Sequence, residues 1–180
     1  MEKEKLEEYL KSIKFDEMAI EEVIAYVETE KDVEALFKKI EVLHNNKVMN
    51  EVIEIILEEN PLFLTTDLET VKLSVNFFKS IGFDNLSEIY DLGPELVSTS
   101  DKRLSENYKL LKIVLDEKEL KKLINNNSEV LSYNTDYLGK RLEFFVKNGL
   151  KDKMFKVLTY DSEILDLEDD EIDLEALKNL

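Results

Sequence analysis

Cysteine is absent from the 180-residue chain, and histidine, proline and glycine are scarce, with one, two and four copies. Without cysteine, disulfide bonds and thiolate metal sites are excluded. His44 has no second histidine to complete a histidine-based triad or metal site, so we expect an exposed residue at a helix end. So few glycines and prolines disfavour an all-β fold, which needs many tight turns.

The chain has no motif that carries catalytic chemistry. Its four glycines form neither a phosphate-binding loop nor a dinucleotide fingerprint. The acidic residues 168–171 lack the glycine and the alternating oxygen ligands of a calcium loop, which favours a solvated tail. We therefore expect no enzyme activity, no metal, no cofactor and no small-molecule substrate.

Long hydrophobic runs are absent too. No apolar run approaches the ~20 residues that a membrane helix needs. The opening residues, Met-Glu-Lys-Glu-Lys-Leu-Glu-Glu, are too charged for a signal peptide and too acidic for an organellar presequence. These observations predict a cytoplasmic protein with no membrane partner.

The sequence that is present favours helices and repeats itself. Leu, Glu, Lys and Ile dominate, and all of them except Ile are good helix formers. Residues 78–85 read Phe-Lys-Ser-Ile-Gly-Phe-Asp-Asn, and residues 10–17, which precede them by 68 positions, read Leu-Lys-Ser-Ile-Lys-Phe-Asp-Glu. Since 68 is twice 34, the chain is predicted to be a stack of similar small units.

Two further patterns recur at the same step. Four short segments have apolar residues in their third and fourth places, and they start at steps of 33, 34 and 34 residues: 61–64, 94–97, 128–131 and 162–165. Bulky pairs follow about 14 positions after the first three segments, as Phe77-Phe78, Leu110-Leu111 and Phe144-Phe145. Each short segment is expected to turn the chain and to bury its two apolar side chains.

One unit illustrates the predicted local structure. Thr66 followed by Glu69 has the pattern of a capping box. An apolar stripe at helical spacing follows, formed by Leu68, Val71, Val75 and Phe78. Gly82 suits the left-handed position that ends a helix, and Gly93-Pro94 stops a second, shorter helix. The fold class is therefore all-α, a helical-repeat superhelix of about four to five units.

The repeats define the predicted domain. We expect one helical-repeat domain over residues 1–167, clear over 51–167 and with an atypical N-terminal unit over 1–50. Helices are expected there at 16–27, around Leu36–Leu43 and before Pro61. End units of repeat proteins often differ because one face meets water. Residues 168–180 are either an acidic tail or a capping helix through Ile172, Leu174 and Leu177.

The repeat pattern resembles the mitochondrial transcription termination factor (mTERF) family. Residues 60–64 with 76–83 match best, and Glu143–Leu150 is the next match. Tetratricopeptide repeats share the period but need small residues where helices cross, and this chain has only four alanines. The resemblance implies units of two α-helices and a short 3₁₀ helix, stacked into a curved superhelix that holds nucleic acid along a basic concave face.

Charge is unevenly distributed along the chain. The net charge is −17, yet residues 101–160 carry 13 Lys and Arg against nine Asp and Glu. Lys118 and Lys121-Lys122 belong to this cationic block. The candidate contacts for nucleic acid or another partner, in this block and on the preceding unit, are Lys79, Lys102, Arg103, Lys109, Lys112, Lys140, Arg141 and Lys147.

Three functions remain open from the sequence. The repeat, the acidity and the missing chemistry favour a non-enzymatic binding module whose partner is a protein. The alternative, implied by the resemblance, is nucleic-acid binding through residues 101–160, although the net charge of −17 opposes long-range attraction of a polyanion. The third is a nucleic-acid mimic that presents clustered carboxylates to a basic groove of another protein.

Overall fold

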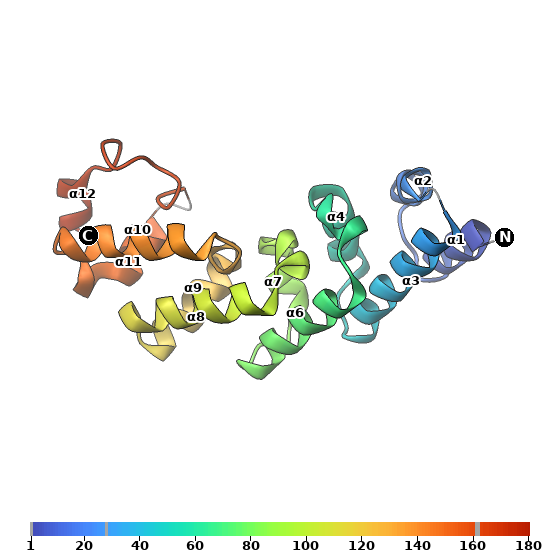
Figure 1. The fold of residues 1–180 in the computed structure, drawn as a ribbon, viewed down its shortest axis with the longest axis horizontal. Helices are drawn as coiled ribbons and strands as arrows, with labels where there is room; N and C mark the ends of the chain where they lie inside the picture. The colour runs from blue at the N-terminus through green and yellow to red at the C-terminus, as the bar shows by residue number, and fades with distance from the viewer. Residues whose placement is uncertain (1, 28, 161–162) are drawn as a thin grey trace. The chain divides into compact units, whose positions relative to one another are not determined.

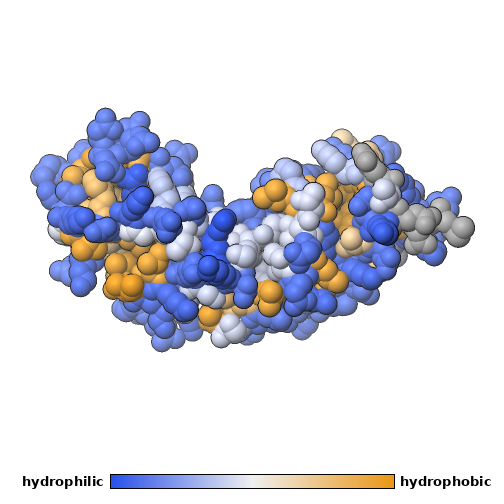
Figure 2. All heavy atoms as spheres, viewed as in Figure 1, coloured by the Kyte–Doolittle hydropathy of each residue, from blue (hydrophilic) through white to orange (hydrophobic). Residues whose placement is uncertain are grey.

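A computed structural model describes residues 2–27, 29–160 and 163–180. The chain divides into two compact units, Met1–Asp101 and Lys102–Leu180, which are described separately below (Figure 1). Every regular element in the described ranges is helical. Hydrophilic side chains cover much of the surface that faces the viewer in Figure 2.

The first unit contains three successive helical repeats. Its elements are α1 (Glu2–Ser12), α2 (Glu17–Tyr26), α3 (Glu30–Asn45), α4 (Asn50–Glu59), α5 (Leu62–Thr65), α6 (Leu68–Ser80), α7 (Leu86–Leu92) and the 3₁₀ helix η1 (Pro94–Ser98). The long helices of neighbouring repeats contact one another, α1 with α3 and α3 with α6. The shorter helices α2, α4 and α7 pack in the same order along the stack.

The second unit contains two further repeats and the acidic C-terminal segment. Its elements are α8 (Asp101–Val114), α9 (Glu117–Asn126), the 3₁₀ helix η2 (Ser128–Leu131), α10 (Thr135–Lys147), the 3₁₀ helix η3 (Lys151–Lys153), α11 (Met154–Tyr160) and α12 (Leu174–Lys178). Helix α9 packs on both η2 and α11. These elements confirm the predicted all-α fold built from helical repeats.

The core consists of the residues that the repeat pattern singles out. Of each bulky pair, the second member is completely buried, as Phe78, Leu111 and Phe145 show. The third and fourth residues of the last three short segments are buried as expected: Leu96, Val97, Val130, Leu131, Ile164 and Leu165. In the first segment Phe63 is buried, but Leu64 is only half-buried, so the expectation that both apolar side chains are buried is wrong there. Ser162, which opens the fourth segment, lies outside the described residues.

Three local expectations differ from the structure. The cap of α6 is Asp67, whose side chain accepts from the Thr70 N–H at 2.8 Å, so the predicted Thr66 capping box is wrong. Thr66 instead donates its hydroxyl to the Leu62 carbonyl at 2.7 Å and closes α5. The short segment after Pro61 is a single α-helical turn, whereas η1 and η2 are 3₁₀ helices. Helix α1 was not predicted, because its first turns carry too many charges to form a clear apolar stripe.

Four of the long helices end in the same way. Lys14, Lys47, Gly82 and Gly149 have positive φ angles of 64°, 64°, 87° and 81°. The residue after each donates its backbone N–H to the carbonyl five positions earlier, at 3.0 or 3.1 Å, as Phe83 does to Phe78. This is the Schellman arrangement, which satisfies helix-end carbonyls and favours glycine at the left-handed position.

Replacing Gly149 with alanine is expected to lower the free energy of unfolding by about 1–2 kcal/mol. A Cβ atom at Gly149 would meet nothing within 4 Å, so the cost comes from the positive φ of 81° and not from a clash. The reverse change, Lys47→Gly, should stabilise the protein because lysine already occupies the unfavourable φ of 64°. Urea unfolding curves of both variants measure the effect, and an unchanged Gly149→Ala stability would contradict the argument.

Candidate binding surface

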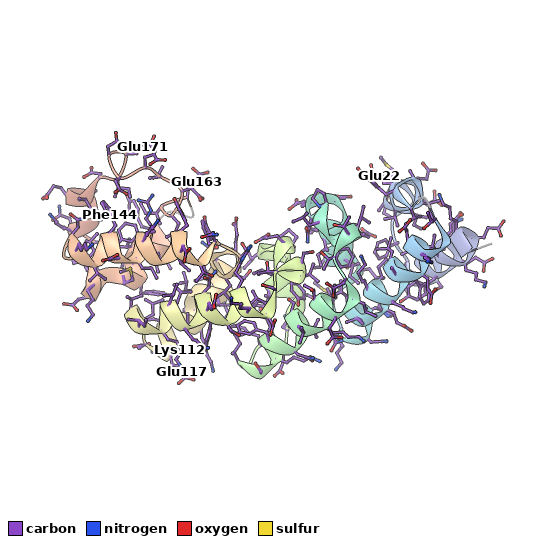
Figure 3. All side chains as sticks on the ribbon, in the orientation of Figure 1. Glu22, Lys112, Glu117, Phe144, Glu163 and Glu171 are labelled. Carbon is purple, nitrogen blue, oxygen red and sulfur yellow. The ribbon has the colours of Figure 1, made fainter. Side chains whose placement is uncertain are left out.

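Four of the candidate cations lie on α8. Lys102, Arg103, Lys109 and Lys112 are all exposed. Lys102 reaches Glu106 one turn away at 3.9 Å. Lys112, which is labelled in Figure 3, has its ammonium 5.7 Å from the centroid of the Tyr108 ring. An exposed pair one helical turn apart contributes little to stability. Lysine side chains on α8 are thus accessible to a partner.

The other candidates occupy different surroundings. Lys140 and Lys147 are exposed on α10, where Lys147 pairs with Glu143 at 2.7 Å. Lys79 belongs to the first unit and donates to the side-chain oxygen of Asn46. The chain therefore brings seven of the eight candidates into the unit of residues 102–180, distributed over α8 and α10.

Helix α9 presents a lysine-rich face of its own. Lys118, Lys121, Lys122 and Asn125 line a shallow hollow of about 410 Å³ with Glu117. Their spacing of one, three and four residues places them on the side opposite the buried Leu120, Leu123 and Ile124. Lys121 contacts Glu117 at 3.8 Å, which offsets part of the charge.

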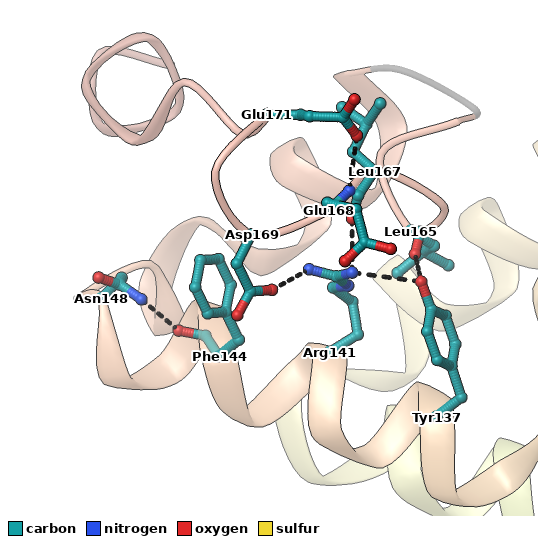
Figure 4. A network of polar contacts seen from close by, with 9 residues as sticks. All are labelled: Tyr137, Arg141, Phe144, Asn148, Leu165, Leu167, Glu168, Asp169 and Glu171. Carbon is teal, nitrogen blue, oxygen red and sulfur yellow. Dashed lines mark hydrogen bonds and ion pairs between the residues drawn. The ribbon is translucent and has the colours of Figure 1, made fainter.

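Arg141 differs from the other candidates because it is buried, with 6% of its surface exposed. Its guanidinium bonds to Asp169 at 2.6 Å, to the Tyr137 hydroxyl at 3.2 Å and to the Leu167 carbonyl (Figure 4). The guanidinium also lies 5.6 Å from the ring centroid of Tyr137 and 5.7 Å from that of Phe144. Arg141 thereby attaches the acidic C-terminal segment to α10, and its donors face groups of the same unit.

Tyrosines reinforce this attachment. The Tyr133 hydroxyl donates to Asp166 at 2.7 Å, and that of Tyr137 donates to the Leu165 carbonyl at 2.6 Å. Burial, together with the nearby Asp166 carboxylate, raises the pKa of Tyr133 well above its usual value. Burial alone would lower the pKa of Arg141, but Tyr137 and Asp169 raise it, so the guanidinium stays charged.

A buried lysine in the first unit escaped sequence analysis. Lys39 of α3 is 1% exposed, and its ammonium donates to the carbonyls of Phe63, Leu64 and Thr66 at 2.5, 3.0 and 3.0 Å. The same ammonium lies 5.0 Å from the centroid of the Phe63 ring. Burial lowers the pKa of Lys39 to about 8, against an opposing effect of Asp67 and Asp32. Lys39 is therefore a structural residue that holds α5 in place.

Lys39 belongs to a series of buried polar residues, one in the long helix of each of four repeats. Ser74 donates to the Leu96 carbonyl at 2.8 Å, and Asn107 donates to the carbonyls of Leu131 and Tyr133 at 3.0 and 2.7 Å. Arg141 makes the equivalent bond to Leu167. Lys39, Ser74, Asn107 and Arg141 follow one another at steps of 35, 33 and 34 residues. This spacing is the sequence signal that could have identified the four residues, because they occupy matching positions in successive repeats. The side chain of each binds the short segment of its own repeat.

No catalytic or metal-binding constellation stands out in the described ranges. No group of three His, Cys, Asp or Glu side chains is placed there to hold a metal ion. His44 lies exposed in the last turn of α3, as expected. Within residues 2–27, 29–160 and 163–180, no helix is both long and apolar enough to cross a bilayer.

Comparison with known proteins identifies the family of the repeats. A family model described as mTERF matches residues 4–162, which covers most of the chain, including nearly all of the first unit and residues 102–162 of the second. No curated protein matches the sequence.

Proposed function

The chain belongs to the mTERF family, and from this premise we propose that it is a non-enzymatic binding module whose partner is a protein. Stacked helical repeats offer extended surfaces for recognition and need no catalytic group. We further propose that the repeats of residues 1–167 together form the binding domain. Residues 168–180 follow it as an acidic segment that includes the short helix α12.

The engagement of the candidate cations within their own unit supports a protein partner. Arg141 is buried against Asp169 and Leu167, Lys147 pairs with Glu143, and Lys102 approaches Glu106. Nucleic-acid affinity depends on Lys and Arg neutralising phosphates and releasing counterions. A cation that is buried against groups of its own unit, as Arg141 is, contributes little to that release.

The charge of the first unit acts in the same direction. Residues 1–101 carry 24 Asp and Glu against 10 Lys and Arg, a net charge of −14. A surface of this charge repels a polyanion within about a Debye length, ~8 Å at physiological salt. It does not oppose association with a protein whose contact surface is neutral or cationic.

Affinity purification with nuclease treatment tests the proposal. Tagged full-length chain is used to recover partners from an extract of the source cells, with and without digestion of RNA and DNA. We expect protein partners that survive digestion and labelled RNA and DNA oligonucleotides that bind weakly even at low salt. Loss of all partners on digestion, together with tight oligonucleotide binding, would overturn a protein-binding function.

Nucleic-acid binding is the second candidate, favoured by the lysine face of α9 and by the exposed lysines of α8. Lys118, Lys121 and Lys122 share one side of α9, and Lys109 and Lys112 are exposed on α8. This function predicts binding that weakens steeply as salt rises. It requires no base-specific contact, because phosphate contacts alone supply non-specific affinity.

The double variant Lys109→Glu with Lys112→Glu distinguishes this candidate. If nucleic acid binds here, the change should weaken binding at least tenfold at low salt, since two phosphate contacts are lost. Gel-shift titration with labelled RNA and duplex DNA provides the measurement. The control is Lys31→Glu with Lys38→Glu, which changes the net charge equally on exposed positions of α3. No shift of wild-type chain at low ionic strength would remove the candidate.

A further inference from the structure

An open apolar groove runs between α8 and α10, wholly within residues 102–180. Its volume is about 230 Å³. Its apolar lining residues are Leu110, Ile113 and Val114 of α8 and Gly139, Leu142 and Val146 of α10. Glu143 is the one charged residue that lines the groove among the described residues. Figure 2 shows hydrophobic side chains gathered on the surface of this unit. We refer to this feature as the α8–α10 groove.

Two apolar side chains that line the groove are exposed to solvent. Ile113 is 73% exposed, the highest value among the large apolar residues of the second unit, and Val146 is 36% exposed. Isolated exposed apolar residues are common, but here they adjoin further apolar residues across a hollow. Adjoining exposed apolar side chains in a hollow form a surface that a partner can cover.

Gly139 gives an independent indication. It lies inside α10, where glycine costs about 1 kcal/mol relative to alanine. A Cβ atom at Gly139 would meet only Leu110 Cδ1, at 3.7 Å, which is an ordinary van der Waals contact. Packing within the unit therefore leaves room for a side chain at this position. Because Gly139 has no side chain, the α10 side of the groove is open and the groove is deeper.

Positive charge borders the groove on both helices. Lys109 lies one helical turn before Ile113, and Lys140 directly follows Gly139. Neither has an ion pair among the described residues, whereas Glu143 is neutralised by Lys147 at 2.7 Å. Residues 102–160 as a whole carry 13 Lys and Arg against eight Asp and Glu. The surroundings of the groove are thus complementary to an acidic ligand, within a chain that is acidic elsewhere.

We propose that the α8–α10 groove binds an amphipathic α-helix of a partner protein, with apolar anchors in the groove and acidic residues facing the lysines. The inference rests on the protein-binding function proposed above. Residues 139–146 extend over about two helical turns, the length spanned by anchors at i, i+4 and i+7. The groove would bury the apolar face of such a helix, and Lys109 and Lys140 would set its orientation.

A labelled synthetic helix tests the groove on the full-length chain. The probe is a fluorescent peptide of about 18 residues, long enough to populate helix, with leucines at i, i+4 and i+7 and glutamates beside them. A second peptide replaces the glutamates with lysines, and a third replaces the leucines with serines. Fluorescence anisotropy measures binding to the wild type and to Ile113→Ser, Gly139→Leu and Gly139→Ala.

We expect the Leu-Glu peptide to bind and the serine peptide not to bind. Ile113→Ser and Gly139→Leu should each weaken binding about tenfold, since one removes an apolar contact and the other fills the groove. Gly139→Ala should raise thermal stability while weakening binding less, which separates folding from recognition. Tyr160→Ser is the matched control, because Tyr160 is 57% exposed outside the groove and should leave binding unchanged.

Three results would overturn the inference. The first is binding that Ile113→Ser and Gly139→Leu leave unchanged, and the second is groove-dependent binding that prefers the lysine peptide. The third is concentration-dependent dimerisation that Ile113→Ser abolishes, which would assign the groove to a second copy of the chain. After any of these results, affinity purification with nuclease treatment can still show whether the full-length chain has protein partners. Failure of the groove inference and failure of the protein-binding function are therefore distinguishable.

Discussion

Replacing Lys39 with alanine is expected to lower the free energy of unfolding by about 3–5 kcal/mol, the largest effect of any exchange of a charged residue in the first unit. The change removes the donor for the carbonyls of Phe63, Leu64 and Thr66, and it leaves a cavity where a 1% exposed side chain lay. Buried carbonyls without a partner retain their full desolvation penalty. Urea unfolding, with hydrogen exchange of α3 and α5, measures the loss.

The neighbouring lysine provides a matched control. Lys38 lies one residue earlier on α3, its side chain is 50% exposed, and it pairs with Glu34 at 2.6 Å. Lys38→Ala should change stability by no more than about 0.5 kcal/mol. Lys39→Met, which preserves most of the volume, should fall between the two. Equal effects of Lys38→Ala and Lys39→Ala would contradict the structural role of Lys39.

The stability contributed by Lys39 should depend on pH. Its pKa is about 8 in the folded chain, below its usual value of 10.5, because burial disfavours the charged ammonium. Below pH 8 both the folded and the unfolded chain hold the proton, and the cost of burying charge is fully present. Between pH 8 and 10.5 the unfolded chain binds more protons, so stability rises with pH. Relative to Lys39→Met, wild-type stability should therefore increase over this interval.

Arg141→Ala is expected to destabilise the second unit by about 3–5 kcal/mol and to release the acidic C-terminal segment. The guanidinium is 6% exposed and bonds to Asp169, Tyr137 and the Leu167 carbonyl, so its removal leaves several groups without their partner. Residues 163–171 should then become sensitive to protease, and the amides of α12 should exchange faster. Limited proteolysis followed by mass spectrometry measures the first change directly.

The two partners of this ion pair should not be equivalent. The side chain of Asp169 is 68% exposed, so Asp169→Asn should cost only about 1 kcal/mol or less. Lys140→Ala, which removes an exposed cation next to Arg141, should have a similarly small effect on stability. A segment that stays protected from protease in Arg141→Ala would show that buried apolar residues such as Ile164 and Leu165 suffice to hold it.

Most of the helices and the repeat could be predicted because their signals are local. Apolar residues at three- and four-residue steps report which face of a helix is buried, as in the Leu138, Leu142 and Phe145 stripe of α10. The positive φ of Gly82 also follows from its own few residues. Even the step of 33–34 residues needs only comparison of the chain with itself.

The sequence by itself thus determined the all-α repeat fold, much of the apolar core and the absence of a recognisable catalytic motif. The tertiary structure alone decided which charged residues are surface and which are interior. Lys39 is the same residue type as its exposed neighbour Lys38, and Arg141 carries the same charge as its exposed neighbour Lys140. Lys39 and Arg141 differ from these neighbours because carbonyls from a segment 24 and 26 residues later approach them and accept their hydrogen bonds. The tertiary structure also decided the α8–α10 groove. Whether the space beside Gly139 is open or filled depends on the side chains that α8 places against α10.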